Sequence, residues 1–310
     1  MVRRKKNSYI KRLGKDIRRN PTLYLMSLPA LLLILLFCYV PMAGILMAFQ
    51  EYSFSEGIFG SEWIGFLNFE LFFNSFYFKD VLLNTFLISL YALVVGFGMP
   101  IIFALLVHSL GKGVFGKTMK ILSIIPYFIS TVVMVSLIQK FFNGYNGIVN
   151  FALETFGIYK KDFINDPNSF YSLFVWTDLW QGMGWSSVIY ISVLGGVPQE
   201  LYDAAKLDGA NKTNVLLNID LPQLVPTITN LLVLELGSLF SVGFEKIYLM
   251  QTTVNSVKSE VISTYVYKMG VLNQDYGFGT AVGLFNSVVC FVLLVVSNFI
   301  VSKFSDYSLW

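Results

Sequence analysis

The most recognisable chemical pattern in this sequence is GKGVFGKT at residues 111–118. Its spacing matches the glycine-rich loop whose backbone N–H groups surround nucleotide phosphates, with Lys117 as the phosphate-binding lysine. That loop works between a buried strand and a helix, whereas here one long apolar run precedes it and another follows it. We therefore interpret the pattern as a short turn, whose glycines permit a chain reversal and whose lysines face the cell interior. A nucleotide site is the alternative.

The remaining reactive side chains form no catalytic or metal-binding pattern. His108, the only histidine, lies at the inner end of an apolar run, where an interfacial role is expected. Cys38 and Cys290 lie in apolar runs without a CxxC pattern, and buried free cysteine behaves as a small hydrophobic residue. Without a Ser/His/Asp arrangement, we predict no enzyme, no metal site, no cofactor bound by this chain and no nucleic-acid partner.

The composition identifies the class of protein. Hydrophobic residues make up 55% of the 310 positions, charged residues 13%, and the mean hydropathy is +0.64. Soluble domains carry about 25% charged residues, so an integral membrane protein is indicated. Runs of roughly 20 apolar residues cross a bilayer as helices, because open strands would leave backbone groups unpaired in lipid. We predict an all-α membrane fold with six transmembrane helices, near 24–49, 81–107, 119–141, 170–195, 224–249 and 280–302.

The distribution of basic residues predicts the orientation. Cytoplasmic segments of membrane proteins are enriched in Lys and Arg. If the N-terminus is inside, fifteen of the 22 Lys and Arg residues lie in the inner segments 1–23, 108–120, 196–223 and 303–310. Both termini and the segment 196–223 are then cytoplasmic. Residues 1–23 form a basic cytoplasmic segment, and residues 24–310 form the transmembrane domain.

Two kinds of local signal lie within the predicted spans. Pro41, Pro100 and Pro126 predict kinks, since proline removes a helical N–H donor. Gly279 and Gly283 form a GxxxG pattern, which predicts a close approach between helices.

The inner segment 196–223 is short, charged and rich in helix-forming residues. Pro198 suits the first turn of a helix, and Gly209 suits a left-handed helix stop. Asn211 can cap a second short helix over 212–218, after which Pro222 marks the return to the membrane. The result would be an exposed helix–turn–helix that docks into a groove of a soluble partner. The alternative is a polar linker without a partner.

The same segment carries a family motif. ELYDAAKLDGANKTNVLLNIDLP, residues 200–222, resembles the EAA loop of ABC importer permeases, with Asp203 in place of the usual glutamate. Similar stretches elsewhere are GFLNF (65–69), DLWQGMGWSSVIY (178–190), SVGFEKIYLM (241–250) and TAVGLFNSVV (280–289). The resemblance covers most of residues 24–310 and extends in particular to the sugar-importer branch that serves oligosaccharides derived from complex polysaccharides.

This resemblance implies a mechanism and a set of partners. The EAA loop would be the coupling helix, which inserts into a cleft of a separate ATPase that carries the ATP and magnesium. The expected complex contains a second homologous permease, two copies of that ATPase and an extracellular solute-binding protein, in a bacterial cell membrane. The expected mechanism is ATP-driven alternating access. The coupling residues implied are Glu200, Asp203, Ala204, Ala205, Asp208, Gly209, Ala210 and Pro222.

Charged and polar groups within the spans predict the substrate path. A charge deep in a membrane costs roughly 2.5–3.5 kcal/mol on insertion scales, so Glu235, which we expect near the midplane, needs a role. Sugars require carboxylates and amides for their hydroxyl groups and aromatic faces for their C–H surfaces. The predicted path residues are Glu235, Asn230, Ser238, Ser241, Trp176, Asp178 and Gln181. Alternatively, these groups hydrogen-bond between helices or across a permease dimer. Trp185 and Tyr190 are interpreted as packing residues.

Two other classes of protein are weighed against an ABC permease. An ion-coupled secondary transporter is expected to have inverted repeats and intramembrane ion sites, and neither is evident in this sequence. A non-transporting scaffold or receptor would use the segment 196–223 only to recruit a partner.

Overall fold

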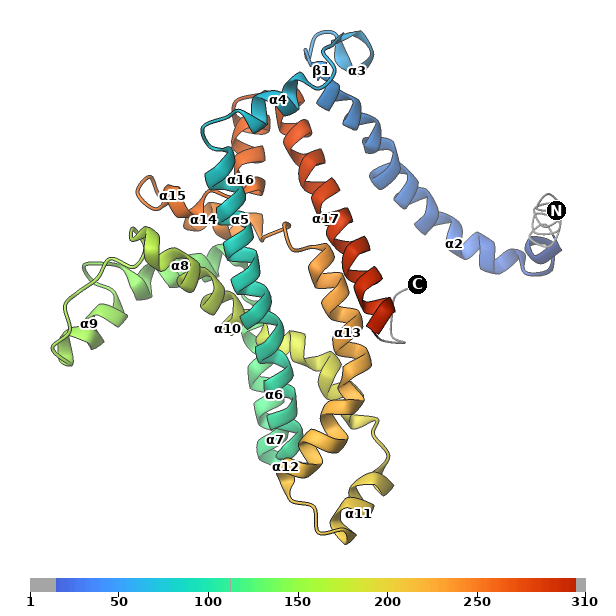
Figure 1. Ribbon diagram of the computed structural model, residues 1–310, viewed down its shortest axis with the longest axis vertical. Helices are drawn as coiled ribbons and strands as arrows, with labels where there is room; N and C mark the ends of the chain where they lie inside the picture. Colours follow the sequence, from blue (N-terminus) through green and yellow to red (C-terminus); the bar gives the residue numbers. More distant parts are fainter. Residues whose placement is uncertain (1–14, 112, 305–310) are drawn as a thin grey trace.

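The computed structural model describes residues 15–111 and 113–304 as an elongated bundle of helices (Figure 1). One end carries the small antiparallel pair β1 (Gln50–Glu51) and β2 (Glu62–Trp63), and the other carries α11 (Gln199–Leu207). The other elements are, in order, α2 (Pro21–Ile34), η1 (Leu35–Tyr39), η2 (Val40–Phe49), α3 (Gly57–Gly60), α4 (Leu67–Phe73), α5 (Phe78–Ala92), η3 (Leu93–Phe97), α6 (Gly98–Ser109), α7 (Val114–Ile124), η4 (Ile125–Phe128), α8 (Thr131–Phe142), α9 (Ile148–Thr155), α10 (Pro167–Gly195), α12 (Lys212–Val215), η5 (Leu216–Asp220), α13 (Leu221–Gly237), α14 (Phe244–Met250), α15 (Ser256–Ser259), α16 (Ile262–Val266), η6 (Tyr267–Leu272) and α17 (Tyr276–Phe304).

Four helices within the described residues are long and apolar enough to cross a membrane, and a fifth is added if one bent pair counts as a single span. The four are Pro21–Phe49, Phe78–Ser109, Lys212–Gly237 and Tyr276–Lys303. The predicted run 170–195 is also helical, as the 29-residue α10, but α10 does not reach the same apolar level. At 1.5 Å per residue α10 is about 43 Å long, enough to span a bilayer.

The kink predicted at Pro126 in the third span, 119–141, is confirmed, and it is a sharp break between two helices. The helix Val114–Phe128 and the helix Thr131–Phe142 meet at an angle of 98°. Pro126 lies in the last helical turn before the break, and Ser130 caps the new helix by accepting a hydrogen bond from the Val133 N–H. The break leaves the Ile129 carbonyl without a helical partner, and Gln181 Nε2 of α10 donates to it at 2.8 Å.

The boundaries predicted for the fifth span, 224–249, are also wrong. The helix begins at Lys212 and ends at Gly237, residues 238–243 are not helical, and α14 is a separate helix. Pro222 does not interrupt this helix. It lies in the first turn of α13, where its missing N–H removes no hydrogen bond within α13, and the π-helical turn η5 precedes it. At this end α13 lies close to α17, since a Cβ at Gly237 would lie 2.7 Å from Leu294.

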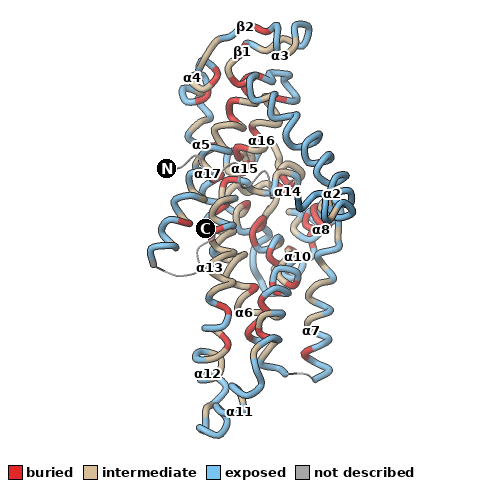
Figure 2. Tube along the Cα trace, turned by 90° about the vertical axis from the view of Figure 1, so that its right-hand side faces the viewer, coloured by how far each residue is buried: buried red, intermediate tan, exposed pale blue. Residues whose placement is uncertain are grey.

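The first span lies apart from the rest of the bundle. α2 has no buried residue and runs away from the other helices, meeting them only towards β1 (Figures 1 and 2). Its exposed side chains are almost all apolar, including Leu31, Leu32 and Leu33, each more than half exposed. Apolar surface of this extent requires lipid or another subunit to cover it.

Glycines fix how closely α10 and α17 approach their neighbours. A Cβ at Gly279 would lie 2.6 Å from the Cα of Gly270, so the predicted close approach is confirmed there, while a Cβ at Gly283 would meet open space. On α10, a Cβ at Gly184 would lie 2.0 Å from the carbonyl oxygen of Ser123 on α7. Gly182, on the same helix, has no atom within 4 Å of its Cβ position.

We predict that Gly184→Ala destabilises the detergent-solubilised protein because the added methyl group forces α10 away from the α7 backbone. Overpacking of this kind costs about 1–3 kcal/mol, so the melting temperature should fall by several degrees. Gly182→Ala is the matched control and should leave the melting temperature unchanged. Equal melting temperatures for the two variants would contradict this packing.

Candidate functional site

A cavity of about 530 Å³ lies in the middle of the bundle. Its walls come from α5, η3, α6, α10, α13 and the non-helical residues after Gly237. Because α13 ends early, the backbone of residues 238–243 reaches the cavity instead of continuing as a helix. The polar lining is Ser89, Asp178, Ser186, Tyr190, Glu235, Ser238 and Ser241, and the other aromatic lining is Phe97, Phe174 and Trp185.

Four of the seven predicted path residues line this cavity. They are Asp178, Glu235, Ser238 and Ser241, and they come from α10, α13 and the segment that follows α13. Carboxylates and hydroxyl groups from separate helices are therefore brought together within the bundle, which the spacing along the chain could not establish.

The other three predicted path residues do not line the cavity. Trp176 donates from Nε1 to the Tyr91 hydroxyl at 2.8 Å, and Gln181 supports the break before α8. Asn230 has a buried amide oxygen without a partner among the described residues. On a helix of 3.6 residues per turn, neighbouring positions face different directions, which is why these three do not line the cavity, and their role in the path stays a prediction.

Trp185 and Tyr190 have more than the packing role predicted for them. The Trp185 ring stacks on Tyr127 with 4.7 Å between ring centroids, and Tyr190 is buried among Ala104, Leu194 and Leu224. Both residues also line the cavity. The cavity therefore combines aromatic surface with carboxylates.

Lys246 on α14 is a functional candidate that the sequence analysis missed. Its ammonium group lies 3.1 Å from Asp178 Oδ1 and 5.3 Å from the centre of the Phe174 ring, and the Lys246 side chain is only 6% exposed. Asp178 is 60% exposed towards the cavity. A buried ammonium needs a partner. A lysine within an apolar stretch, 68 residues after an intramembrane aspartate, was the signal that could have found this pair.

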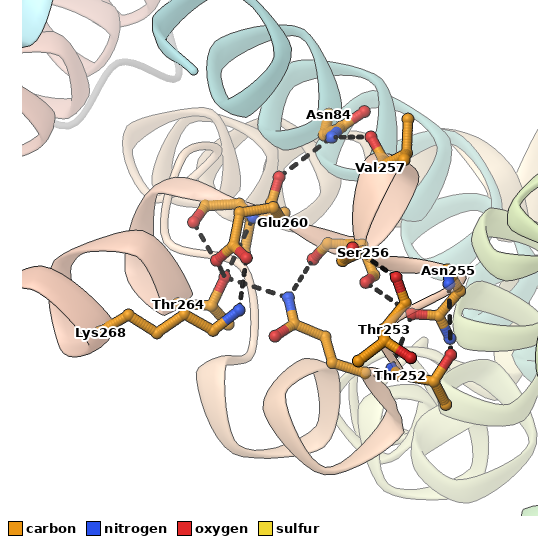
Figure 3. Close-up of polar contacts among 12 residues, drawn as sticks. Asn84, Thr252, Thr253, Asn255, Ser256, Val257, Glu260, Thr264 and Lys268 are labelled. Carbon is orange, nitrogen blue, oxygen red and sulfur yellow. Dashed lines mark hydrogen bonds and ion pairs between the residues drawn. The ribbon is translucent and has the colours of Figure 1, made fainter. Parts of the chain in front are cut away.

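The end of the bundle near α15 and α16 is held by polar contacts (Figure 3). Asn84 of α5 donates from Nδ2 to the carbonyl oxygens of Val257 and Glu260, at 2.9 and 3.1 Å. The Glu260 carboxylate accepts from Thr264 and forms an ion pair with Lys268. The segment that connects α14 to η6 is thus anchored to the bundle rather than free.

The opposite end carries the segment 196–223. Gly209 has φ +74°, so the predicted left-handed helix stop is confirmed, and the Asn211 side chain caps the next helix by accepting from the Asn214 N–H at 2.8 Å. The separate second helix predicted over 212–218 is wrong, because residues 212–237 form one continuous helix. Glu200, Asp203, Ala204, Asp208 and Gly209 are exposed, while Ala205 and Ala210 are half-buried.

The glycine-rich pattern at 111–118 lies in a turn between two helices. α6 ends at Ser109, α7 begins at Val114, and Gly111 has φ +72°. Residue 112 lies outside the described residues. A phosphate-binding loop follows a strand, whereas this turn follows the helix α6.

A bundle of long apolar helices with a polar central cavity, and with an exposed charged helix at one end, defines a membrane permease. The chain matches the family described as "Binding-protein-dependent transport system inner membrane component" over residues 96–306, and it belongs to that family. It is therefore the inner-membrane transport component of an ABC system.

Individual relatives agree with this assignment. The chain is 35% identical to "Protein LplB" of Bacillus subtilis, over 100% of this chain and 99% of that protein. It is also 35% identical to the "Polygalacturonan/rhamnogalacturonan transport system permease protein YteP" of the same organism, over 97% of this chain and 94% of that protein. A crystal structure of a bacterial alginate ABC transporter, in complex with an alginate pentasaccharide-bound periplasmic protein, contains a chain that matches with TM-score 0.88 and 33% identity. That match covers 96% of this chain and 100% of that chain.

We predict that the two partners of the Asp178–Lys246 pair are not equivalent for stability. Asp178→Asn leaves a buried ammonium unpaired and should cost up to about 3 kcal/mol. Lys246→Met leaves a carboxylate that the cavity can hydrate, and should cost less. The double variant Asp178→Asn/Lys246→Met should recover much of the loss, measured as thermal stability in detergent. A double variant less stable than both single variants would refute this asymmetry.

Proposed function

We propose that this chain is one transmembrane subunit of an ABC importer that brings an oligosaccharide into a bacterial cell. The cavity is the observation that carries the proposal. Carboxylates, hydroxyl groups and aromatic rings line one space of about 530 Å³, and a volume of this order is typical of small-molecule sites. Sugars require this combination, and permeases of sugar polymers are among the relatives.

The proposed topology has six membrane crossings with both termini in the cytoplasm. The crossings are the four long apolar helices, α10, and the bent pair of α7 and α8. The basic residues of 1–23 support this orientation, which makes α11 cytoplasmic and the segment held by Asn84 external. We place the chain in a bacterial cell membrane because its family consists of inner-membrane transport components and its relatives are bacterial.

The proposed partners follow from what the family requires and from the surfaces available. Two copies of a cytoplasmic ATPase supply ATP hydrolysis, one of them docked on α11, and a second related permease completes the cavity. A solute-binding protein delivers the sugar to the outer segments 50–80, 142–169 and 251–279. The alginate transporter structure with its periplasmic protein supports the last of these. ATP binding would draw the coupling helices together and open the cavity outwards.

We predict that the complete complex in proteoliposomes takes up oligosaccharide when ATP is supplied. This uptake should persist when the proton and sodium gradients are collapsed. An ion-coupled transporter would lose uptake when the gradient collapses, and a scaffold would show no uptake.

Within this assay, Glu235→Leu should lower uptake at least tenfold because it removes the cavity carboxylate. Leu234→Ala, one position away and outside the lining, should not. Normal uptake by Glu235→Leu would show that this carboxylate has no role in the path.

We predict that Gly209→Val weakens association of the ATPase because a β-branched residue does not adopt the left-handed conformation that orients α11. Gly157, with φ +75°, has an equally open Cβ position in the segment 142–169. Gly157→Val introduces the same strain away from α11 and is the matched control. Co-purification of the ATPase with each variant is the measurement, and equal recovery would contradict the docking role of this segment.

A further inference from the structure

Three side chains from three elements form a hydrogen-bonded chain at the α11 end of the bundle. Tyr202 of α11 donates from its hydroxyl to Asp220 Oδ1 at 2.7 Å, and His108 Nε2 of α6 lies 3.1 Å from the same hydroxyl. His108 Nε2 is also 3.9 Å from Asp220 Oδ1. Residues that are 94 and 18 positions apart in sequence therefore meet at one point.

The direction of these hydrogen bonds follows from the chemistry of the groups. The Tyr202 hydroxyl group has one hydrogen, which it donates to the Asp220 carboxylate. The Tyr202 oxygen can then only accept from His108, so His108 carries a hydrogen on Nε2. Burial, together with the hydrogen bond to Asp220 and the negative charge of Asp220, raises the pKa of Tyr202 well above its usual value, which keeps the phenol protonated.

Tyr202 is the side chain through which α11 is attached to the membrane helices. Within the described residues, no other α11 side chain hydrogen-bonds to a different element, since Gln199, Asp203 and Lys206 bond only within α11. Most of α11 is exposed, and Leu207 is 90% exposed. A force applied to the outer surface of α11 therefore reaches the bundle through few contacts besides Tyr202 and the chain itself.

Asp220 lies where that force would enter the bundle. It is 3% exposed and immediately precedes α13. Leu224 of α13 is fully buried beside Leu105 of α6 and Leu194 of α10. The same α13 carries Glu235, and the same α6 carries Pro100, both of which line the cavity. A displacement at Asp220 and His108 would thus move two walls of the cavity together.

We infer that Tyr202, held by Asp220 and His108, is the positioning residue that transmits movement of α11 to the helices lining the cavity. This inference rests on the proposed function, because it assumes that an ATPase moves α11. The role differs from docking: the docking surface faces the partner, whereas the Tyr202 hydroxyl faces the bundle.

The test is the number of sugar molecules transported per ATP hydrolysed, measured in proteoliposomes that contain the complete transporter. Tyr202→Phe removes one hydroxyl and keeps the ring. We expect the ATPase subunits to co-purify normally and ATP hydrolysis to persist, while the transport ratio falls at least threefold. His108→Ala should give the same pattern, and His108→Gln, which restores an N–H donor, should recover most of the ratio.

Ser109→Ala is the matched control. It removes a 2.7 Å hydrogen bond at the same end of α6, but one that joins Ser109 only to Leu106 of its own helix. Its transport ratio should equal that of the unmodified protein.

An unchanged ratio in both Tyr202→Phe and His108→Ala would overturn the inference. Loss of the ATPase from the Tyr202→Phe complex would also overturn it, because Tyr202 would then belong to the docking surface. If the unmodified chain neither co-purified with an ATPase nor supported ATP-dependent uptake, the proposed function itself would fail.

Discussion

The cost of an unpaired polar group between apolar helices governs this structure. Every helical break and every intramembrane charge must find a partner or a hydrated cavity. The Ile129 carbonyl, freed by the bend before α8, accepts from Gln181. The Lys246 ammonium pairs with Asp178, whose other face is open to the cavity. Asp178 also lines the cavity, and a carboxylate that lines a hydrated space avoids part of the desolvation that burial would impose.

Irregular backbone is concentrated where it shapes that cavity. α13 stops at Gly237, and the non-helical residues that follow bring Ser238 and Ser241 into the lining. If α13 continued as a straight helix to residue 249, only the side chains on one face of that helix would line the cavity. Close glycine contacts, at Gly184 with α7 and at Gly237 with α17, hold the surrounding helices in place. Rigid packing around a few breaks gives a binding surface that is formed before a ligand arrives.

The two ends of the molecule have different physical characters that suit different partners. The end near α15 and α16 is tied to α5 by the side chain of Asn84, which makes it a preformed surface. α11, in contrast, stands away from the bundle on a left-handed turn and is attached through a short chain of hydrogen bonds. A preformed surface at one end and a loosely attached helix at the other are consistent with the proposed binding-protein and ATPase partners.

The sequence by itself determined the class of protein, the presence of long apolar helices, and the helix stop and cap at Gly209 and Asn211. These features depend on local composition and on single-residue conformational preferences, which act wherever the residue is placed. Only the tertiary structure decided the bend of 98°, the end of α13, the pairing of Lys246 with Asp178 and the meeting of His108, Tyr202 and Asp220. For the same reason the sequence could not show that, of the predicted path residues, Trp176, Gln181 and Asn230 do not line the cavity. Which face of a helix meets a cavity depends on its rotation against its neighbours, and that rotation is set by contacts between residues far apart in the chain.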